Sequence, residues 1–254
     1  MITLEGVELK YNTENGCFFA LRDISLTIPK AKCTAVIGMS GCGKTSLLNV
    51  MSGLTKPTGG RVFFEGRPLE NPRPEISVVF QEYGLFPWKT VFDNIALPLA
   101  LQKKSRSQQE EQVQALLSQM CLEEHRNKYP SQLSGGQRQR VAISRALIRK
   151  PQVLLMDEPF SSLDALSREQ LQGTILDLLR GKKLTLAVVT HSIEEALFMG
   201  DNIAVFSPEG SRIACIVPNA DCRRRHFRES GEFYQKCAML RKLLRSGSYE
   251  AEIS

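Results

Sequence analysis

The sequence predicts an α/β fold with a mostly parallel sheet, an antiparallel β subdomain and an inserted helical subdomain. Short apolar, β-branched runs alternate with helical segments, a pattern typical of a parallel sheet that helices cover on both faces. Residues 2–9 and 20–28 instead alternate apolar and polar side chains, which indicates half-buried strands of a second, antiparallel patch. From about residue 92 to residue 150 the apolar spacing is helical, so helices interrupt the series of strands.

The individual elements follow in chain order without an internal repeat or a low-complexity linker. CTAVIG, residues 33–38, is a short apolar run that ends in glycine, as a fully buried strand does. KTSLLNVMSGL, which starts at Lys44, has helical spacing and is closed by Gly53 and Pro57. Further strands are expected over 61–66, 76–81, 153–156 and 186–190, and further helices over 107–119 and 229–245.

The chain is expected to form a single large domain. We place this domain at residues 1–240, the inserted helical subdomain at about 85–150, and a C-terminal tail at 241–254. The net charge of +6 is compatible with nucleic acid, an anionic small molecule or an anionic membrane, and selects none of them. No secretion signal and no run of apolar residues long enough to span a bilayer is recognisable, so the chain itself is not expected to cross a membrane.

A glycine-rich loop predicts a triphosphate site. GMSGCGKT, from Gly38 to Thr45, matches G-x-x-x-x-G-K-[ST] and lies between a buried strand and a helix, where backbone N–H groups can surround phosphates. Lys44 is expected to bridge the β and γ phosphates, and the Thr45 hydroxyl to hold Mg²⁺. The alternative is a glycine-rich turn that binds nothing. The residues predicted to line the site are Gly38, Met39, Ser40, Gly41, Cys42, Gly43, Lys44, Thr45 and Ser46.

Two carboxylates follow a second buried strand, VLLMDE. Asp157 is expected to hold Mg²⁺ and Glu158 to polarise the attacking water. Taken alone, two acids after an apolar strand are more often a solvated turn, and the phosphate loop is what favours the catalytic interpretation. Cys42 lies beside Lys44 in that loop, and we expect its thiol to be reactive, because the nearby positive charge and the helix N-terminus favour the thiolate.

The segment LSGGQ, residues 133–137, predicts a second anion-binding helix end. Ser134, Gly135, Gly136 and Gln137 precede or open a helix whose N-terminus is positive. Because one chain encloses its own triphosphate with the first loop, this second site is expected to serve the nucleotide of another copy. Two chains packed head to tail would then hold two nucleotides at their seam. The alternative is an ordinary N-cap serine with flexible residues before a helix.

With these motifs the sequence resembles the ATP-binding subunits of ABC transporters over residues 1–240. The resemblance implies a P-loop NTPase core of the RecA-like type and ATP and Mg²⁺ as ligands. It also implies that Tyr11 stacks on adenine, Gln81 touches Mg²⁺, Asp164 of SSLD lies along the dimer seam, and His191 lies near the γ-phosphate. An edge-strand tyrosine and a structural histidine are the alternatives for Tyr11 and His191.

The segment EYGLFPWKTVFDNIALPL, residues 82–99, is similar to importer ATPases for nitrate, sulfonate, taurine and pyrimidine precursors. That resemblance implies transmembrane permease subunits as partners, an extracytoplasmic solute-binding protein acting indirectly, and a place at the cytoplasmic face of the membrane. Phe86, Pro87 and Trp88 either face the permease or hold the loop on its own subdomain.

Other functions compete with solute import. A soluble ABC ATPase acting on DNA or ribosomes is disfavoured because no long heptad insertion and no second cassette is visible, so nucleic acid is not an expected partner. An ATPase of an ABC exporter is a further alternative. Glu158 and His191 argue against a cassette that binds ATP without hydrolysis. The basic tail is either a helix packed on the core or, through residues 223–225, a contact with anionic lipid headgroups.

Overall fold

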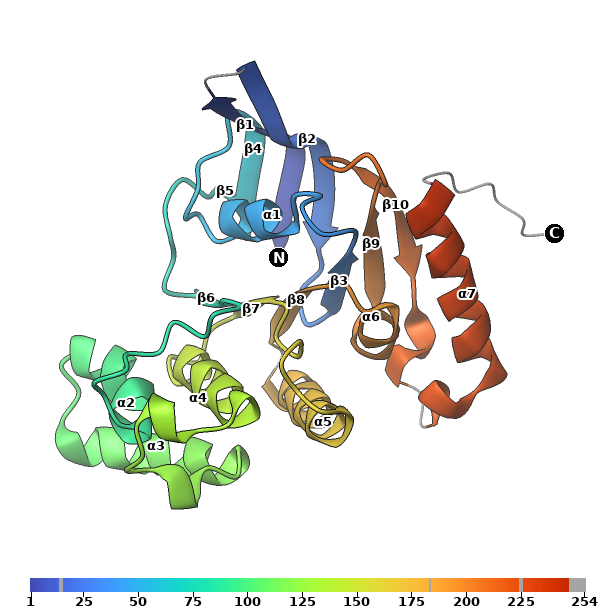
Figure 1. The fold of residues 1–254 in the computed structure, drawn as a ribbon. Coiled ribbons are helices and arrows are strands. Elements are labelled where there is room, and N and C mark those ends of the chain that lie inside the picture. The colour runs from blue at the N-terminus through green and yellow to red at the C-terminus, as the bar shows by residue number, and fades with distance from the viewer. Residues whose placement is uncertain (14–15, 183, 224–225, 247–254) are drawn as a thin grey trace. The chain divides into compact units, whose positions relative to one another are not determined.

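The computed structural model describes residues 1–13, 16–182, 184–223 and 226–246 (Figure 1). The chain forms two compact units, one made of Met1–Arg73 and Thr185–Ser254 and the other of Pro74–Leu184. We call them unit 1 and unit 2 and describe each by itself. The α/β class is confirmed, with a mostly parallel sheet, a separate antiparallel sheet and a helical region, whereas the domain bounds expected from the sequence stay a prediction.

Unit 1 contains the antiparallel sheet that the alternating pattern predicted. Its strands lie in the order β2-β1-β4-β5. Alternate residues of β2 turn toward the core, so Leu26 is buried while its neighbours Ser25 and Thr27 are exposed. The strands are β1 (Ile2–Thr13), β2 (Gly16–Ile28), β4 (Gly59–Phe64) and β5 (Arg67–Pro68).

Unit 1 also contains β10-β9-β3-β8, where β3 pairs in parallel with β8 and β9, and β10 is antiparallel to β9. All residues of β3 and β8 are buried, as continuous apolar strands between helices should be. Apolar patterning did not predict β5, β9 or β10. The elements are β3 (Cys33–Ile37), α1 (Lys44–Met51), β8 (Thr185–Thr190), α6 (Ile193–Met199), β9 (Asn202–Phe206), β10 (Ile213–Pro218), η3 (Ala220–Arg223), η4 (Phe227–Glu229) and α7 (Gly231–Ser246).

The C-terminal helix α7 packs on the core of unit 1, beside α6 and β9 (Figure 1). Phe233, Cys237 and Leu240 recur at helical spacing and join the cluster formed by β3, α6 and β9. The helix expected from the sequence is therefore confirmed, and its apolar face is covered. The proposed lipid contact of residues 223–225 falls on residues 224–225 and the side chain of Arg223, which lie outside the described part of the chain.

Unit 2 pairs two short parallel strands and carries the helical region. β6 and β7 pair with Val79 opposite Met156, and α2 contacts both α3 and α4. The Thr90 side chain caps α2, and Ser105 and Gln108 form a capping box on α3. The elements are β6 (Ile76–Val79), α2 (Val91–Leu101), α3 (Arg106–Gln119), η1 (Glu123–His125), η2 (Pro130–Gln132), α4 (Gly135–Leu147), β7 (Val153–Asp157) and α5 (Ala165–Lys182).

None of the helices within the described ranges has both the length and the hydropathy that crossing a lipid bilayer requires.

Candidate active site

The glycine-rich loop of unit 1 joins β3 to α1 in a tight conformation. Gly41 has φ 78° and Gly43 has φ 109°, both in the left-handed region that favours glycine. A Cβ on Gly43 would lie 2.3 Å from the carbonyl oxygen of Ala20, so the loop passes directly against β2. The loop residues Met39, Ser40, Gly41 and Thr45 are exposed or half-buried, as is Ser46. The predicted phosphate cradle therefore opens toward solvent at the N-terminus of α1.

Lys44 holds the loop in this conformation. Its side chain is only 6% exposed, and its Nζ donates to the carbonyl oxygens of Gly38 at 2.9 Å and Met39 at 2.7 Å. A buried ammonium requires acceptors of this kind. The charge is thus kept within the loop by carbonyl groups, where an anionic ligand could replace them.

The expectation that Cys42 favours a thiolate is wrong in direction. Cys42 is buried, and this burial raises the pKa of its thiol, while the neighbouring Lys44 ammonium offsets the rise only in part. The turn between β9 and β10 covers the residue, with the Ser211 N–H donating to the Cys42 carbonyl oxygen at 2.8 Å. The sequence correctly indicated a positive charge near the Cys42 sulfur, but it could not show that the sulfur is shielded from water.

We therefore expect Cys42 to react slowly with thiol reagents. In nucleotide-free protein at pH 7–8, the exposed Cys17 and Cys121 should be alkylated at least about tenfold faster than Cys42, because only the thiolate is nucleophilic. Peptide mass spectrometry over a time course measures the three rates. Alkylation of Cys42 as fast as that of Cys17 would contradict the buried, protonated state.

Strand pairing brings His191 to the same edge of the sheet as the glycine-rich loop. Ile37, the residue before Gly38, pairs with Thr190, the residue before His191. Because β3 and β8 are parallel, their carboxyl ends lie side by side and the two following segments leave the sheet together. His191 is exposed at this edge. This pairing is long-range, so no local signal in the sequence could have placed His191 there.

Tyr11 lies at the exposed end of the β1–β2 pair, directly opposite Phe18. Both rings are about half exposed, as an aromatic platform for a planar ligand requires. A pocket of about 290 Å³ lies next to this strand pair. Sequence reasoning missed the pocket, although three adjacent residues on an alternating strand, Cys17 to Phe19, form part of it. Its lining residues are Cys17, Phe18, Phe19, Arg22, Glu209, Gly210, Ser211 and Arg212.

The predicted carboxylates lie in unit 2, at the end of β7. Asp157 is buried at the strand terminus, and Glu158 follows it half-buried with φ 44°, a left-handed conformation that is uncommon outside glycine. Gln81 follows the parallel neighbour β6, and its Nε2 lies 3.5 Å from Glu158 Oε2. The structure therefore brings Gln81, Asp157 and Glu158 together, as adjacent parallel strands should.

The LSGGQ segment opens α4 with a complete capping box. Ser134 Oγ accepts from the Gln137 N–H, and Gln137 Oε1 accepts from the Ser134 N–H. The other end of the Gln137 side chain lies 2.8 Å from His125 Nε2. Both polar atoms of the Gln137 side chain are thus engaged within the chain, while Ser134 is exposed at the start of α4.

The two glycines of LSGGQ make room for the SSLD segment of the same chain. A Cβ on Gly136 would lie 2.8 Å from Leu163 Cδ2, and one on Gly135 would lie 3.3 Å from the Ser162 carbonyl oxygen. Asp164 is exposed next to this contact, and hydrogen bonds from the Ser167 hydroxyl and amide lower the pKa of its carboxyl. Larger residues at these two positions would therefore push against SSLD, so packing alone favours glycine there.

Arg145 fixes the loop that follows Gln81. Its guanidinium donates to the carbonyl oxygens of Gly84 at 2.7 Å and Tyr83 at 2.9 Å. The Tyr83 hydroxyl lies 2.6 Å from Ser162 Oγ, so the same loop also touches SSLD. Sequence reasoning did not single out Arg145 or Tyr83, because their partners are distant in the chain.

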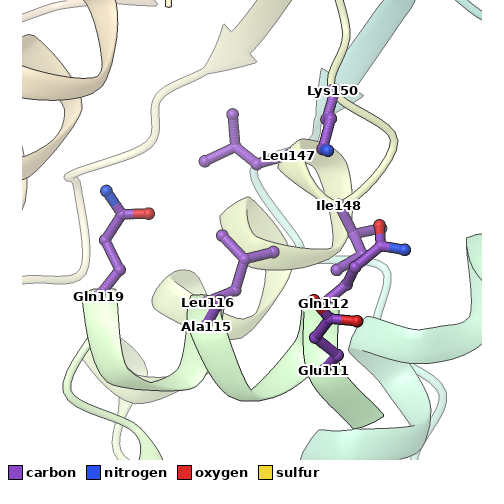
Figure 2. A pocket seen from close by; sticks show the side chains of 8 residues that line it. All are labelled: Glu111, Gln112, Ala115, Leu116, Gln119, Leu147, Ile148 and Lys150. Atoms are coloured by element: carbon purple, nitrogen blue, oxygen red, sulfur yellow. The ribbon is translucent and has the colours of Figure 1, made fainter. Parts of the chain in front are cut away.

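A second pocket, of about 200 Å³, lies between α3 and the end of α4 (Figure 2). Figure 2 shows that its lining side chains come from α3, among them Leu116, and from the end of α4, among them Leu147. It contains none of the predicted site residues, so it is separate from the nucleotide motifs of unit 2. Its lining residues are Glu111, Gln112, Ala115, Leu116, Gln119, Leu147, Ile148 and Lys150.

Residues 21–161, more than half of the chain, match the profile of the family described as ABC transporter. The chain belongs to the ABC transporter family. Members of this kind are ATP-binding subunits that hydrolyse ATP to power transport and associate with the membrane as part of the transporter. ATP is therefore the nucleotide that the chain binds.

Similar ABC transporter proteins come from several bacteria. The chain is 43% identical to the nitrate import ATP-binding protein NrtD of Synechococcus elongatus, over 78% of this chain and 73% of that protein. It is 40% identical to the taurine import ATP-binding protein TauB of Pseudomonas aeruginosa, over 88% and 85% of the two chains. Among solved structures, the dimeric ATP-binding cassette MJ0796 in a post-hydrolysis state with ADP and Pi has a TM-score of 0.79. Its identity to this chain is 30%, and the match covers 86% of this chain and 98% of that one.

Proposed function

We propose that this ABC transporter subunit hydrolyses ATP to power the import of a small anionic solute such as nitrate or a sulfonate. Its similarity over most of its length to nitrate and taurine import subunits is the single observation that carries this assignment. Nitrate and the sulfonate group of taurine both carry negatively charged oxygen atoms. A pyrimidine precursor is the alternative solute in this proposal.

The phosphates of ATP are proposed to bind the loop Gly38–Ser46, with adenine on Tyr11. The tight turn of the loop, the positive φ of Gly41 and Gly43 and the start of α1 at Lys44 all support an anion there. The Lys44 ammonium, which already bonds two loop carbonyl oxygens, is the cation that moves to the β and γ phosphates. The exposed pair Tyr11 and Phe18 supports the base site.

Residues suited to Mg²⁺ are present in both units. The hydroxyl of Thr45, the amide oxygen of Gln81 and the buried carboxylate of Asp157 are hard oxygen donors of the kind that Mg²⁺ selects. Asp157 lies at the carboxyl end of β7, directly before Glu158, whose carboxylate is near Gln81 Nε2, and this grouping supports Asp157 as a ligand. When bound, Mg²⁺ neutralises charge on the phosphate oxygens during transfer.

Glu158 is proposed to accept the proton of the attacking water, and His191 to contact the γ-phosphate. Glu158 is half-buried, held in an unusual backbone conformation, and has Gln81 Nε2 near its carboxylate. Strained backbone often occurs where a side chain must be aimed. His191 leaves the sheet beside the phosphate loop, which supports its assigned place.

Two copies are proposed to pack head to tail, with ATP at the seam. Ser134, Gly135, Gly136 and the nearby Asp164 would meet the nucleotide of the partner subunit. Support comes from the exposed Ser134 at the positive end of α4 and from the dimeric state of the similar cassette.

The transmembrane permease is proposed to dock on the loop around Trp88, on the cytoplasmic face of the membrane. Trp88 is 71% exposed, whereas Phe86 is anchored by the buried amide of Asn94 and packs at 5.5 Å from the Trp88 ring. The loop is therefore rigid beneath and apolar outside, as a docking site should be. The solute-binding protein would act on the outer side of the permease.

Deleting the gene and measuring uptake tests the import function. Cells lacking the chain should lose accumulation of labelled nitrate or taurine, and the wild-type chain should restore it. The Glu158→Gln variant should not restore uptake, and it therefore shows whether expression of the chain without ATP hydrolysis is sufficient. Unchanged uptake of both solutes together with impaired efflux of another compound would contradict import and favour an exporter.

A further inference from the structure

A hydrogen-bonded ring in unit 1 joins Glu195 to Thr190 and Ser192, the two neighbours of His191 in the chain. The Thr190 hydroxyl donates to Glu195 Oε2 at 2.6 Å, and the same hydroxyl oxygen accepts from the Ser192 N–H at 3.0 Å. Ser192 Oγ in turn accepts from the Glu195 N–H at 3.2 Å, as the N-cap of α6. Each neighbour of His191 is therefore tied to Glu195.

Glu195 is unusual because its side chain is only 5% exposed. Carboxylates are almost never this buried unless hydrogen bonds satisfy them, and a charge-assisted O–H···O bond of this length is a strong one. Capping α6 would need only the Ser192 side chain. The Glu195 carboxylate in addition reaches Thr190, the residue before His191.

We propose that Glu195 is the positioning residue of His191, fixing the backbone on both sides of the histidine through Thr190 and Ser192. The inference rests on the proposed role of His191 at the γ-phosphate. Thr190 is itself fixed by its strand pairing with Ile37 beside the phosphate loop. The ring therefore sets the exit direction of His191 relative to Gly38, while the imidazole stays exposed for the phosphate.

The neighbouring Glu194 offers a matched control. It is also an acid in the first turn of α6, but its side chain is half exposed, accepts from the Ser192 hydroxyl and pairs with Arg241 at 3.5 Å. Glu194→Gln therefore removes a similar charge from the same turn without opening the buried ring.

Two pairs of variants test the ring. Thr190→Val removes the hydroxyl at nearly constant volume and Thr190→Ser keeps it, while Glu195→Ala removes the acceptor and Glu195→Gln retains one. Thr190→Val and Glu195→Ala should each lower kcat for ATP hydrolysis roughly tenfold to a hundredfold with KM within about twofold, because a small misplacement near the chemistry is costly. Thr190→Ser, Glu195→Gln and the Glu194→Gln control should stay near wild type.

The position of the imidazole is measured separately by NMR. The chain has three histidines, His125, His191 and His226, so their ring protons can be assigned by replacing each in turn. Thr190→Val and Glu195→Ala should shift or broaden the His191 signals and leave the other two unchanged. If Glu195→Ala does not fold, the shape-conserving Thr190→Val carries the test.

Several results would overturn the proposal. His191 signals that do not move in Thr190→Val show that the ring does not position the imidazole. An equal further loss of kcat when Thr190→Val is added to His191→Ala shows a general structural effect instead. If the signals move but His191→Ala hydrolyses ATP at the wild-type rate, the positioning stands and the proposed role of His191 in hydrolysis is what fails.

Discussion

Replacing Glu158 with glutamine is expected to lower ATP turnover at least about 100-fold while ATP affinity changes by no more than a few-fold. Glutamine keeps the size of the side chain and an oxygen that can face Gln81 Nε2, which lies 3.5 Å from the carboxylate. What it loses is the ability to accept a proton from water. A loss of this size corresponds to about 2.7 kcal/mol of transition-state stabilisation.

The same variant is expected to form an ATP-dependent dimer that does not dissociate. Phosphate release gives turnover, and light scattering with Mg²⁺ and ATP gives the oligomeric state. Glu111→Gln, an exposed position on α3, is the control for loss of one negative charge and should behave as wild type. Unchanged turnover in Glu158→Gln would remove its assignment as the base, and a monomer with ATP bound would contradict the shared seam.

Replacing Gly43 with alanine is expected to destabilise unit 1 by about 3 kcal/mol or more and to weaken ATP binding more than about 100-fold. Two causes act together. The φ of 109° is strained for any side chain, and the added Cβ would lie 2.3 Å from the Ala20 carbonyl oxygen and 3.3 Å from Leu21 Cδ2. Backbone atoms cannot move aside as a flexible side chain can, so either the loop or β2 must shift.

Gly41→Ala separates these two causes. Gly41 also has a positive φ, of 78°, but a Cβ there would meet no atom within 4 Å. We expect it to cost only about 1–2 kcal/mol, the strain of the left-handed conformation. Urea denaturation measures both free energies of unfolding, and calorimetric titration measures ATP affinity. Equal stability losses for the two variants would show that the close approach to β2 is unimportant.

The sequence by itself was enough to predict the residues that are proposed to bind and hydrolyse ATP. A phosphate loop works through consecutive backbone N–H groups, a lysine and a hydroxyl, so its residues must be neighbours in the chain and can be read directly. The same holds for the serine and glycines of LSGGQ and for the acids after β7. Strand β3 was predictable for a similar reason. Its residues form a short run that is apolar apart from Thr34 and ends before a glycine, and such a run is typical of a buried strand.

Only the tertiary structure decided which of these pieces lie together, since strand order depends on pairings between residues far apart in sequence. The register of β3 with β8 brings His191 beside Gly38, and that of β6 with β7 brings Gln81 to Glu158. Burial is equally non-local: the turn at Ser211 covers Cys42, whose pKa is raised by burial against the expectation from the adjacent lysine alone. From the sequence alone, Glu195 is indistinguishable from an exposed surface acid. Only the structure shows that its carboxylate is buried against Thr190.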